Sequence, residues 1–182
     1  EAVITGIKEA LADAKEKYGI TSCIIMCFLR HLSQEEAFKT LEEAMAFKDD
    51  IIGVGLDSSE LGNPPSKFKD VFKTAEEAGF KLVAHAGEEA DFSYIYEALD
   101  LLNINRIDHG VQSIKSPELM QRLKDEQMPL TVCPNSNIEL RVFGNYKEHN
   151  IKELLDYGLN ISVNSDDPAY FKGYINQNFI NI

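Results

Sequence analysis

The sequence predicts an α/β protein whose parallel strands form part of a (β/α) barrel. Six short apolar segments begin near residues 22, 51, 81, 106, 130 and 160, and stretches of helical periodicity separate them. Strands that alternate with helices in this way form a parallel sheet. Several of these strands end in residues that carry chemistry, which favours a barrel over an open sheet with a single switch point. We therefore expect one (β/α) barrel domain over residues 1–182.

The first elements follow from periodicity and capping signals. Apolar residues at helical spacing predict a helix over residues 3–18, and Gly19 ends it. The apolar run 22–29 predicts a strand that is buried on both faces. Ser33, followed three positions later by Glu36, has the spacing of a capping box and begins the next helix.

The rest of the chain alternates in the same way. Residues 57–65 are rich in turn formers and predict a loop. Ser116 and Pro117 predict the N-cap and the first position of a helix. The other expected elements are strands at 51–56, 81–84, 106–108, 130–133 and 160–163, and helices at about 67–78, 92–102, 117–126 and 147–157.

Composition narrows the possible partners. The net charge is −12, and the acidic residues are spread along the chain. Such a surface repels phosphate backbones, so we expect neither nucleic acid nor an anionic membrane as a partner. No apolar run approaches the ~18 residues of a membrane span. The first residues lack the basic region of a signal peptide, and we expect a cytoplasmic protein.

The cysteine pattern gives no sign of a disulfide framework. Cys23, Cys27 and Cys133 are odd in number and lie in apolar, strand-like runs. We expect buried, reduced thiols, as in a cytoplasmic protein. The C-x-x-C spacing is missing, so a cysteine-ligated zinc ion is not expected.

Three predicted strands end in, or are followed closely by, histidine and carboxylate residues. His85 precedes Glu88, His109 is followed by a glycine, and Asp166 and Asp167 follow the last strand. The carboxyl ends of parallel strands meet at one face, so these side chains should converge. A lone histidine there is more often structural, and Asp167 could simply cap the next turn. Taken together, imidazole and carboxylate groups are typical of a hydrolytic metal centre.

The motifs resemble those of a known family. His85-Ala86-Gly87-Glu88, Asp108-His109-Gly110 and Ser165-Asp166-Asp167-Pro168, in this order, resemble the adenosine/adenine deaminase family of metal-dependent amidohydrolase barrels. Segments 55–65, 130–134 and 164–171 resemble its adenine deaminase branch. The resemblance covers nearly the whole chain and implies a zinc-dependent hydrolase of purine salvage that converts adenine to hypoxanthine and ammonia.

The resemblance also implies roles for individual residues. These are zinc ligation by His85 and Asp166, general base for His109, proton donation to the purine ring by Glu88, and substrate contacts by Asp167 (imidazole edge) and Ser58 (pyrimidine edge). The runner-up substrate is the nucleoside adenosine. An interpretation of another class is a non-catalytic barrel fragment that self-associates.

The chain departs from the family pattern in one important respect. The family carries a His-x-His pair on its first strand, and this pair supplies two further zinc ligands. Here the histidines are His31, His85, His109 and His149, with no such pair. The chain thus resembles the third to eighth strands of an eight-stranded (β/α)8 barrel, and the resemblance implies a single incomplete barrel domain over residues 1–182. We expect it to bind zinc weakly or not at all and to be inactive alone. We also expect its open sheet edges to self-associate.

Four further side chains are ambiguous from sequence. His31, at the end of a predicted strand, could line the site or simply end the strand. His149 is expected on the solvated surface. Tyr170 and Phe171 could form a lid over a base-sized pocket, but core positions are expected. Ala90-Asp91 stands where the family suggests Gly-Pro after two glutamates, which affects the expected loop shape.

Overall fold

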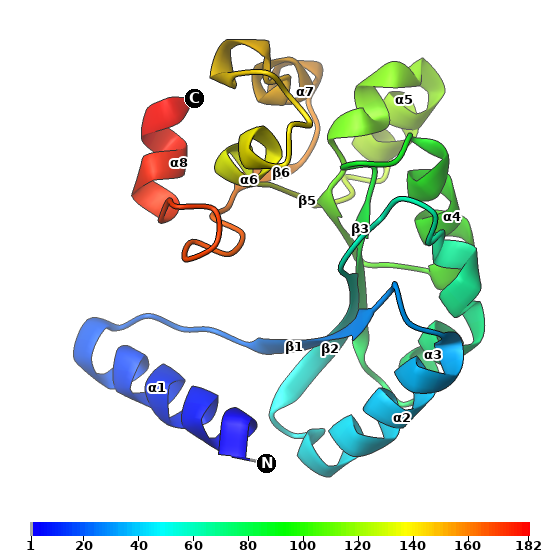
Figure 1. Cartoon of the computed structure of the whole chain (residues 1–182), viewed down its shortest axis with the longest axis vertical. Coiled ribbons are helices and arrows are strands. Elements are labelled where there is room, and N and C mark those ends of the chain that lie inside the picture. The colour runs from blue at the N-terminus through cyan, green and yellow to red at the C-terminus, as the bar shows by residue number, and fades with distance from the viewer. Residues whose placement is uncertain (1) are drawn as a thin grey trace.

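A computed structural model describes residues 2–182 of the chain. Six parallel strands form one sheet in sequential order, β1 to β6 (Figure 1). Every strand therefore pairs with the strand that follows it in the chain, as expected for consecutive βα units of a barrel. The strands are β1 (Ile24–Leu29), β2 (Ile51–Asp57), β3 (Lys81–Ala86), β4 (Arg106–His109), β5 (Leu130–Val132) and β6 (Ile161–Val163).

Helices connect the strands, and those between β1 and β5 cover one side of the curved sheet (Figure 1). Ser33 caps α2 by accepting a hydrogen bond from the Glu36 amide, and Ser116 caps α5 in the same way. The α-helices are α1 (Ala2–Tyr18), α2 (Gln34–Ala44), α3 (Lys69–Glu77), α4 (Ser93–Leu102), α5 (Pro117–Asp125), α6 (Pro134–Glu139), α7 (Ile151–Tyr157) and α8 (Ile175–Asn181), with 3₁₀ turns η1 (Met45–Phe47), η2 (Pro65–Phe68), η3 (Val111–Lys115) and η4 (Tyr146–Glu148).

The hydrophobic core lies between the sheet and these covering helices. Leu56, Phe72, Ile95 and Leu123 are fully buried there, and each contributes roughly 1.5–3 kcal/mol by its removal from water. Phe28 and Phe72 meet edge to face, with their ring centroids 5.7 Å apart. This core fixes the strands, and the strands in turn fix the residues at their carboxyl ends.

The expectation that the first strand is buried on both faces is wrong. In β1 only Phe28 is buried, and the neighbouring Leu29 is 48% exposed. The apolar run alone favours burial on both faces, whereas β1 forms the edge of the sheet within residues 2–182, as the resemblance to the third strand of a barrel implies, and pairs only with β2.

Two helices lie where none was expected. α6 begins at Pro134, and its polar residues Asn135, Ser136 and Asn137 are buried, so it lacks the apolar stripe by which helices are predicted. α8 buries a single residue, Asn178. The helix expected at 147–157 is instead the short turn η4 followed by α7, which ends at Gly158 as expected.

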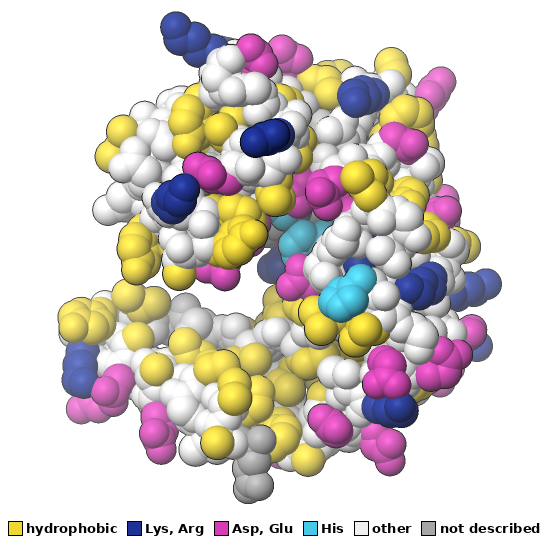
Figure 2. Space-filling view, viewed as in Figure 1, with side chains coloured by type: hydrophobic (Ala, Val, Ile, Leu, Met, Phe, Trp, Pro, Cys, Tyr) yellow, Lys and Arg dark blue, Asp and Glu magenta, His cyan; other side chains and the backbone are white. Residues whose placement is uncertain are grey.

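α1 forms where expected, but none of its described residues is buried. It lies apart from the covering helices at the open side of the sheet (Figure 1). Val3 is 73% exposed, and hydrophobic side chains are visible over this part of the surface (Figure 2). None of the helices in residues 2–182 is both long and apolar enough to cross a membrane.

Candidate active site

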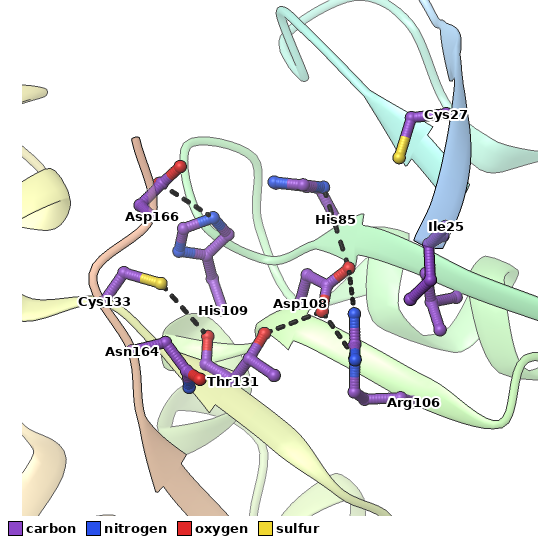
Figure 3. A pocket seen from close by; sticks show the side chains of 11 residues that line it. Ile25, Cys27, His85, Arg106, Asp108, His109, Thr131, Cys133, Asn164 and Asp166 are labelled. Carbon is purple, nitrogen blue, oxygen red and sulfur yellow. Dashed lines mark hydrogen bonds and ion pairs between the residues drawn. The ribbon is translucent and has the colours of Figure 1, made fainter. Parts of the chain in front are cut away.

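The strand ends converge as the sequence predicts. In the β3–β4 register, Ala86 lies opposite His109, so His85 and His109 end neighbouring strands. Their ring centroids are 4.8 Å apart, and Asp166, three residues after β6, approaches them from the far side (Figure 3). On the face seen in Figure 2, the surface is hollowed at a place where histidine and acidic side chains gather.

His85 is oriented by a backbone contact. Its Nδ1 lies 3.0 Å from the carbonyl oxygen of Leu56, at the end of β2. A carbonyl oxygen only accepts, so Nδ1 carries the hydrogen, and in the neutral form of the ring the lone pair lies on Nε2. Histidines that bind metals are commonly held by such a contact through the other ring nitrogen. The donor chemistry of His85 therefore fits a metal ligand.

His109 is buried between two carboxyl groups. Its Nε2 lies 3.7 Å from Asp166 Oδ2, and its Nδ1 lies 3.2 Å from Glu88 Oε1. Burial, and to a smaller extent the neighbouring His85, holds the pKa of His109 well below its usual value. The ring is therefore neutral at physiological pH and able to accept a proton.

Glu88 sits in the turn after β3, and the residue is only 6% exposed. Burial above all, and then the charges of Asp166 and Glu60, raises the pKa of Glu88 to about 8. A carboxyl group with this pKa is mostly protonated at neutral pH, which suits a proton donor. Burial of the side chain in this turn is the main cause, so the turn itself keeps Glu88 protonated.

The turn that presents Glu88 is held by a residue that the sequence interpretation missed. The carboxylate of Glu60 is buried and accepts four backbone hydrogen bonds, from Gly87 (2.6 Å), Glu88 (3.0 Å), Glu89 (2.8 Å) and Ala90 (3.0 Å). Glu60 lies in the loop interpreted only as turn-forming, and a buried carboxylate cannot be recognised from a local pattern.

Gly87 is the residue that this turn requires. Its φ is +68°, and a Cβ at this position would lie 2.5 Å from Cδ1 of Ile95. Any side chain would therefore clash with α4 in addition to the conformational strain. Gly87 thus permits close packing of the turn against α4.

The second cluster that sequence missed lies on α6. Asn137 is buried and donates a hydrogen bond of 2.6 Å from Nδ2 to Glu88 Oε1. Ser136 Oγ lies 3.5 Å from the same oxygen. In the sequence, polar residues at the start of a short helix look like ordinary turn formers. Only their burial shows that they belong to the site, and burial is not visible in the sequence.

The predicted substrate contacts line one cavity. A cavity of about 410 Å³ is bounded by Ser58, Glu88, Asp166, Asp167 and His85, with Asp57, Ser59, Glu89, Leu140, Tyr170 and Phe171 completing the wall. A neighbouring cavity of about 340 Å³ shares His85 and Asp166 and is lined also by His109. All six predicted site residues therefore lie at one place, although their individual roles remain predictions.

Asp167 and His31 combine structural contacts with a position near the cavity. Asp167 Oδ1 accepts the backbone hydrogens of Ala169 and Tyr170, both at 3.0 Å, so this residue does cap the following turn. The ring of His31 is 2.7 Å from Ser58 Oγ through Nδ1. His31 is therefore attached to the cavity wall by way of Ser58.

Three expectations about burial are wrong. Tyr170 is 72% exposed at the cavity rim, because the turn capped by Asp167 projects away from the core, while Phe171 is buried. His149 is only 7% exposed, because it packs with its ring 4.4 Å from that of Phe143. Cys23 is exposed, because it precedes the edge strand β1 instead of lying within it.

The other two cysteines face the interior to different degrees. Cys27 is partly buried, and burial raises the pKa of its thiol to about 12. Cys133 is buried and lies within 4.8 Å of His109 and Asp166, measured between possible ligand atoms. Burial raises the pKa of the Cys133 thiol as well, which opposes formation of the thiolate when no metal is bound.

Comparison with known proteins accounts for this arrangement of residues. The family model described as adenosine deaminase matches residues 1–182. The chain belongs to the adenosine deaminase family.

Two highly similar curated relatives carry the same name. The chain is 90% identical over its full length to an adenine deaminase of Psychrobacter cryohalolentis and 63% identical to that of Acinetobacter baylyi, and in each case it covers 55% of the relative. The chain thus spans about half the length of the curated relatives it matches.

Solved structures confirm the fold. An adenine deaminase structure from Arthrobacter aurescens superimposes with a TM-score of 0.94 at 48% identity, over 98% of this chain and 54% of that one. A Burkholderia ambifaria amidohydrolase, solved with bound zinc, gives a TM-score of 0.87 at 28% identity, over 97% and 50%. The six strands are thus part of a barrel of this superfamily, as expected.

Proposed function

We propose that the protein which contains this chain deaminates adenine hydrolytically, giving hypoxanthine and ammonia. The observation that carries the proposal is the pairing of a buried, protonated Glu88 with a neutral His109 at 3.2 Å, beside Asp166 and His85. Acid and base so close together suit the addition of water across a carbon–nitrogen double bond. The names of the relatives support adenine as the substrate.

The donor set fits one zinc ion. His85 offers the lone pair of Nε2 and Asp166 offers a carboxylate oxygen, both ligand types that zinc accepts. When bound, such an ion lowers the pKa of a coordinated water to about 7. The zinc-bound relative from Burkholderia supports the identity of the ion. Two more ligands would have to come from residues outside this chain.

The protein's own groups would divide the remaining work. His109 accepts a proton from the attacking water, and Glu88 donates a proton to the ring nitrogen beside the carbon under attack. Protonation of that nitrogen offsets part of the lost aromaticity. His109 would then pass its proton to the exocyclic nitrogen, so that the carbon–nitrogen bond breaks and ammonia leaves. The remaining hydroxyl proton of the tetrahedral carbon would restore the acid form of Glu88. Asp167 and Ser58 would hold the two edges of the purine.

The proposal also covers the binding partner and the cellular role of the protein. The partner is a small purine base, and we propose neither nucleic acid nor a membrane as a binding surface, consistent with the net charge of −12. A cytoplasmic role in purine salvage is the corresponding cellular proposal. Ammonia release from adenine and from adenosine, measured side by side, decides between the base and the nucleoside.

Two substitutions test the assignment in the protein at its natural length. Glu88→Gln keeps the shape but has no acidic proton, so turnover of adenine should fall by about 10²–10⁴-fold while zinc content is unchanged. His85→Ala should lose both zinc and activity, because a ligand is removed. If Glu88→Gln turns over adenine within a few-fold of the wild type, Glu88 is not the proton donor.

A further inference from the structure

The candidate site continues beyond its predicted residues into a buried chain of hydrogen bonds. His149 Nδ1 lies 3.1 Å from the backbone nitrogen of Ile151, and His149 Nε2 lies 3.1 Å from Asn137 Oδ1. Asn137 Nδ2 lies 2.6 Å from Glu88 Oε1. Glu88, Asn137 and His149 are all buried, so water does not replace these contacts.

The donor and acceptor of each hydrogen bond in this series follow from the first bond, between the Ile151 backbone and His149. A backbone N–H can only donate, so Nδ1 of His149 must be the acceptor and carry no hydrogen. Burial lowers the pKa of His149 to about 4, and the neutral ring therefore has its one hydrogen on Nε2. That hydrogen is donated to Asn137 Oδ1. The amide of Asn137 is thereby held with its nitrogen toward the candidate site.

The consequence falls on Glu88. The Asn137 amide donates to Oε1 at 2.6 Å, and the Ser136 hydroxyl lies 3.5 Å from the same oxygen. An oxygen that accepts these hydrogens is a poor place for the acidic proton, which is therefore directed to Oε2. The Asn137 nitrogen also lies 3.3 Å from His109 Nδ1, so one amide contacts both the acid and the base.

We propose that His149 and Asn137 are positioning residues that orient Glu88, so that Oε1 accepts from the protein and Oε2 carries the proton given to the substrate. This rests on the proposed function, since it concerns the acid of that reaction. Neither residue lines the two cavities of the candidate site, so both act through Glu88. Their effect is on the rate of proton transfer and not on the affinity for substrate.

The first test uses the unmodified protein and no substrate. Long-range ¹H–¹⁵N NMR spectra of the imidazole rings, recorded at neutral pH on the protein at its natural length, distinguish the two neutral tautomers of His149. The expected result is a hydrogen on Nε2 and none on Nδ1. A hydrogen on Nδ1 would reverse the direction of the hydrogen bonds and overturn the proposal, whichever substrate the protein acts on.

The second test uses a matched pair of variants. His149→Phe removes the donor and frees the Asn137 amide to rotate, so kcat for adenine should fall about tenfold or more, as expected for one lost hydrogen bond to a charged or polar site, with KM within about threefold. His149→Gln can place an N–H donor where Nε2 lies, and it should recover most of kcat. Circular dichroism and thermal melting confirm that both variants are folded.

The outcomes separate this proposal from the proposed function. A wild-type protein without adenine deaminase activity would contradict the function, and the tautomer would still decide the direction of the hydrogen bonds. An active wild type with a folded His149→Phe variant of unchanged kcat would overturn the positioning role alone. Equal losses of kcat in the Phe and Gln variants would also overturn it, because a purely structural role predicts no recovery.

Discussion

Glu88 is a carboxyl group whose surroundings oppose its ionisation, and this couples its protonation to stability. Burial raises the pKa of Glu88 to about 8 in the folded chain, from 4.5 in the unfolded chain. Between these two values the folded protein keeps a proton that the unfolded chain releases. The free energy of unfolding should therefore fall as pH rises through this window, and change no further above it.

The prediction is that Glu88→Gln removes this pH dependence. Gln does not titrate, so the metal-free variant should gain stability relative to the wild type by at least about 2 kcal/mol between pH 5 and pH 8.5. Urea unfolding of both proteins at the two pH values measures the difference. Glu89→Gln is the matched control, because this neighbouring side chain is exposed. Parallel pH profiles for Glu88→Gln and the wild type would contradict the buried, protonated state.

At the scale of single residues, the sequence predicted the groups that lie in motifs. His85, Glu88, His109 and Asp166 stand at strand ends, where the periodicity of the chain alone locates them. Glu60, Asn137 and His149 were missed or misplaced, because their importance depends on burial by distant segments. His149, for example, is buried by packing and hydrogen bonds around α6 and α7, and its neighbours in sequence are polar.

At the scale of elements, the turn after β3 is held from both sides. Arg30, at the end of β1, donates from Nη1 to the carbonyl oxygen of His85 at 2.7 Å. Glu60, after β2, accepts the four amide hydrogens of residues 87–90. Two buried charges on neighbouring strands therefore fix a segment that carries a proposed metal ligand and the proposed acid.

The prediction for this element concerns Glu60→Gln. Oε2 of Glu60 accepts three of the four amide hydrogens, and Oε1 accepts that of Gly87. The NH₂ group of Gln must face at least one N–H, which leaves a buried donor unpaired and should cost about 1–3 kcal/mol of stability. Thermal or urea unfolding measures the loss, and kcat for adenine should fall with it. An unchanged melting temperature would show that the turn does not depend on this carboxylate.

The elements themselves were predicted well where a period of hydrophobicity existed. All six strands and α1 to α5 were predicted within a few residues, since their apolar faces pack against the core or continue a helical stripe. α6 could not be predicted, because its buried face is made of amides and hydroxyls that bind Glu88 and Asn178. The exposure of β1 was missed because its apolar run was interpreted by itself, although the resemblance to the third to eighth strands of a barrel places this strand at an open edge.

At the scale of the whole molecule, zinc affinity tests how complete the site is. The 182-residue chain offers His85 and Asp166, whereas catalytic zinc sites normally have three protein ligands. Zinc should therefore be lost from the purified chain on dialysis, as measured by atomic absorption. Tightly held, stoichiometric zinc would contradict this expectation. Loss of such zinc in Cys133→Ser would then assign it to the cluster of Cys133, His109 and Asp166.

The last prediction concerns self-association, and it rests on the outer strands of the sheet and the exposed helix α1. Within residues 2–182, β1 and β6 each pair on one side only, and unpaired strand edges recruit other chains. α1 adds an unburied apolar face that includes Val3 and Ile7. We propose that the 182-residue chain self-associates, and light scattering at micromolar concentration should show dimers or larger species.

A matched pair of substitutions on α1 tests whether this apolar face takes part in the association. Ile7→Lys places a charge on the face and should shift the mass toward the monomer. Glu9→Gln changes the net charge by the same single unit, but at an already polar, exposed position of the same helix, so it should leave the mass unchanged. A wild-type chain that is a sharp monomer with a cooperative melt would contradict self-association, and equal masses for the two variants would exclude α1 from the contact.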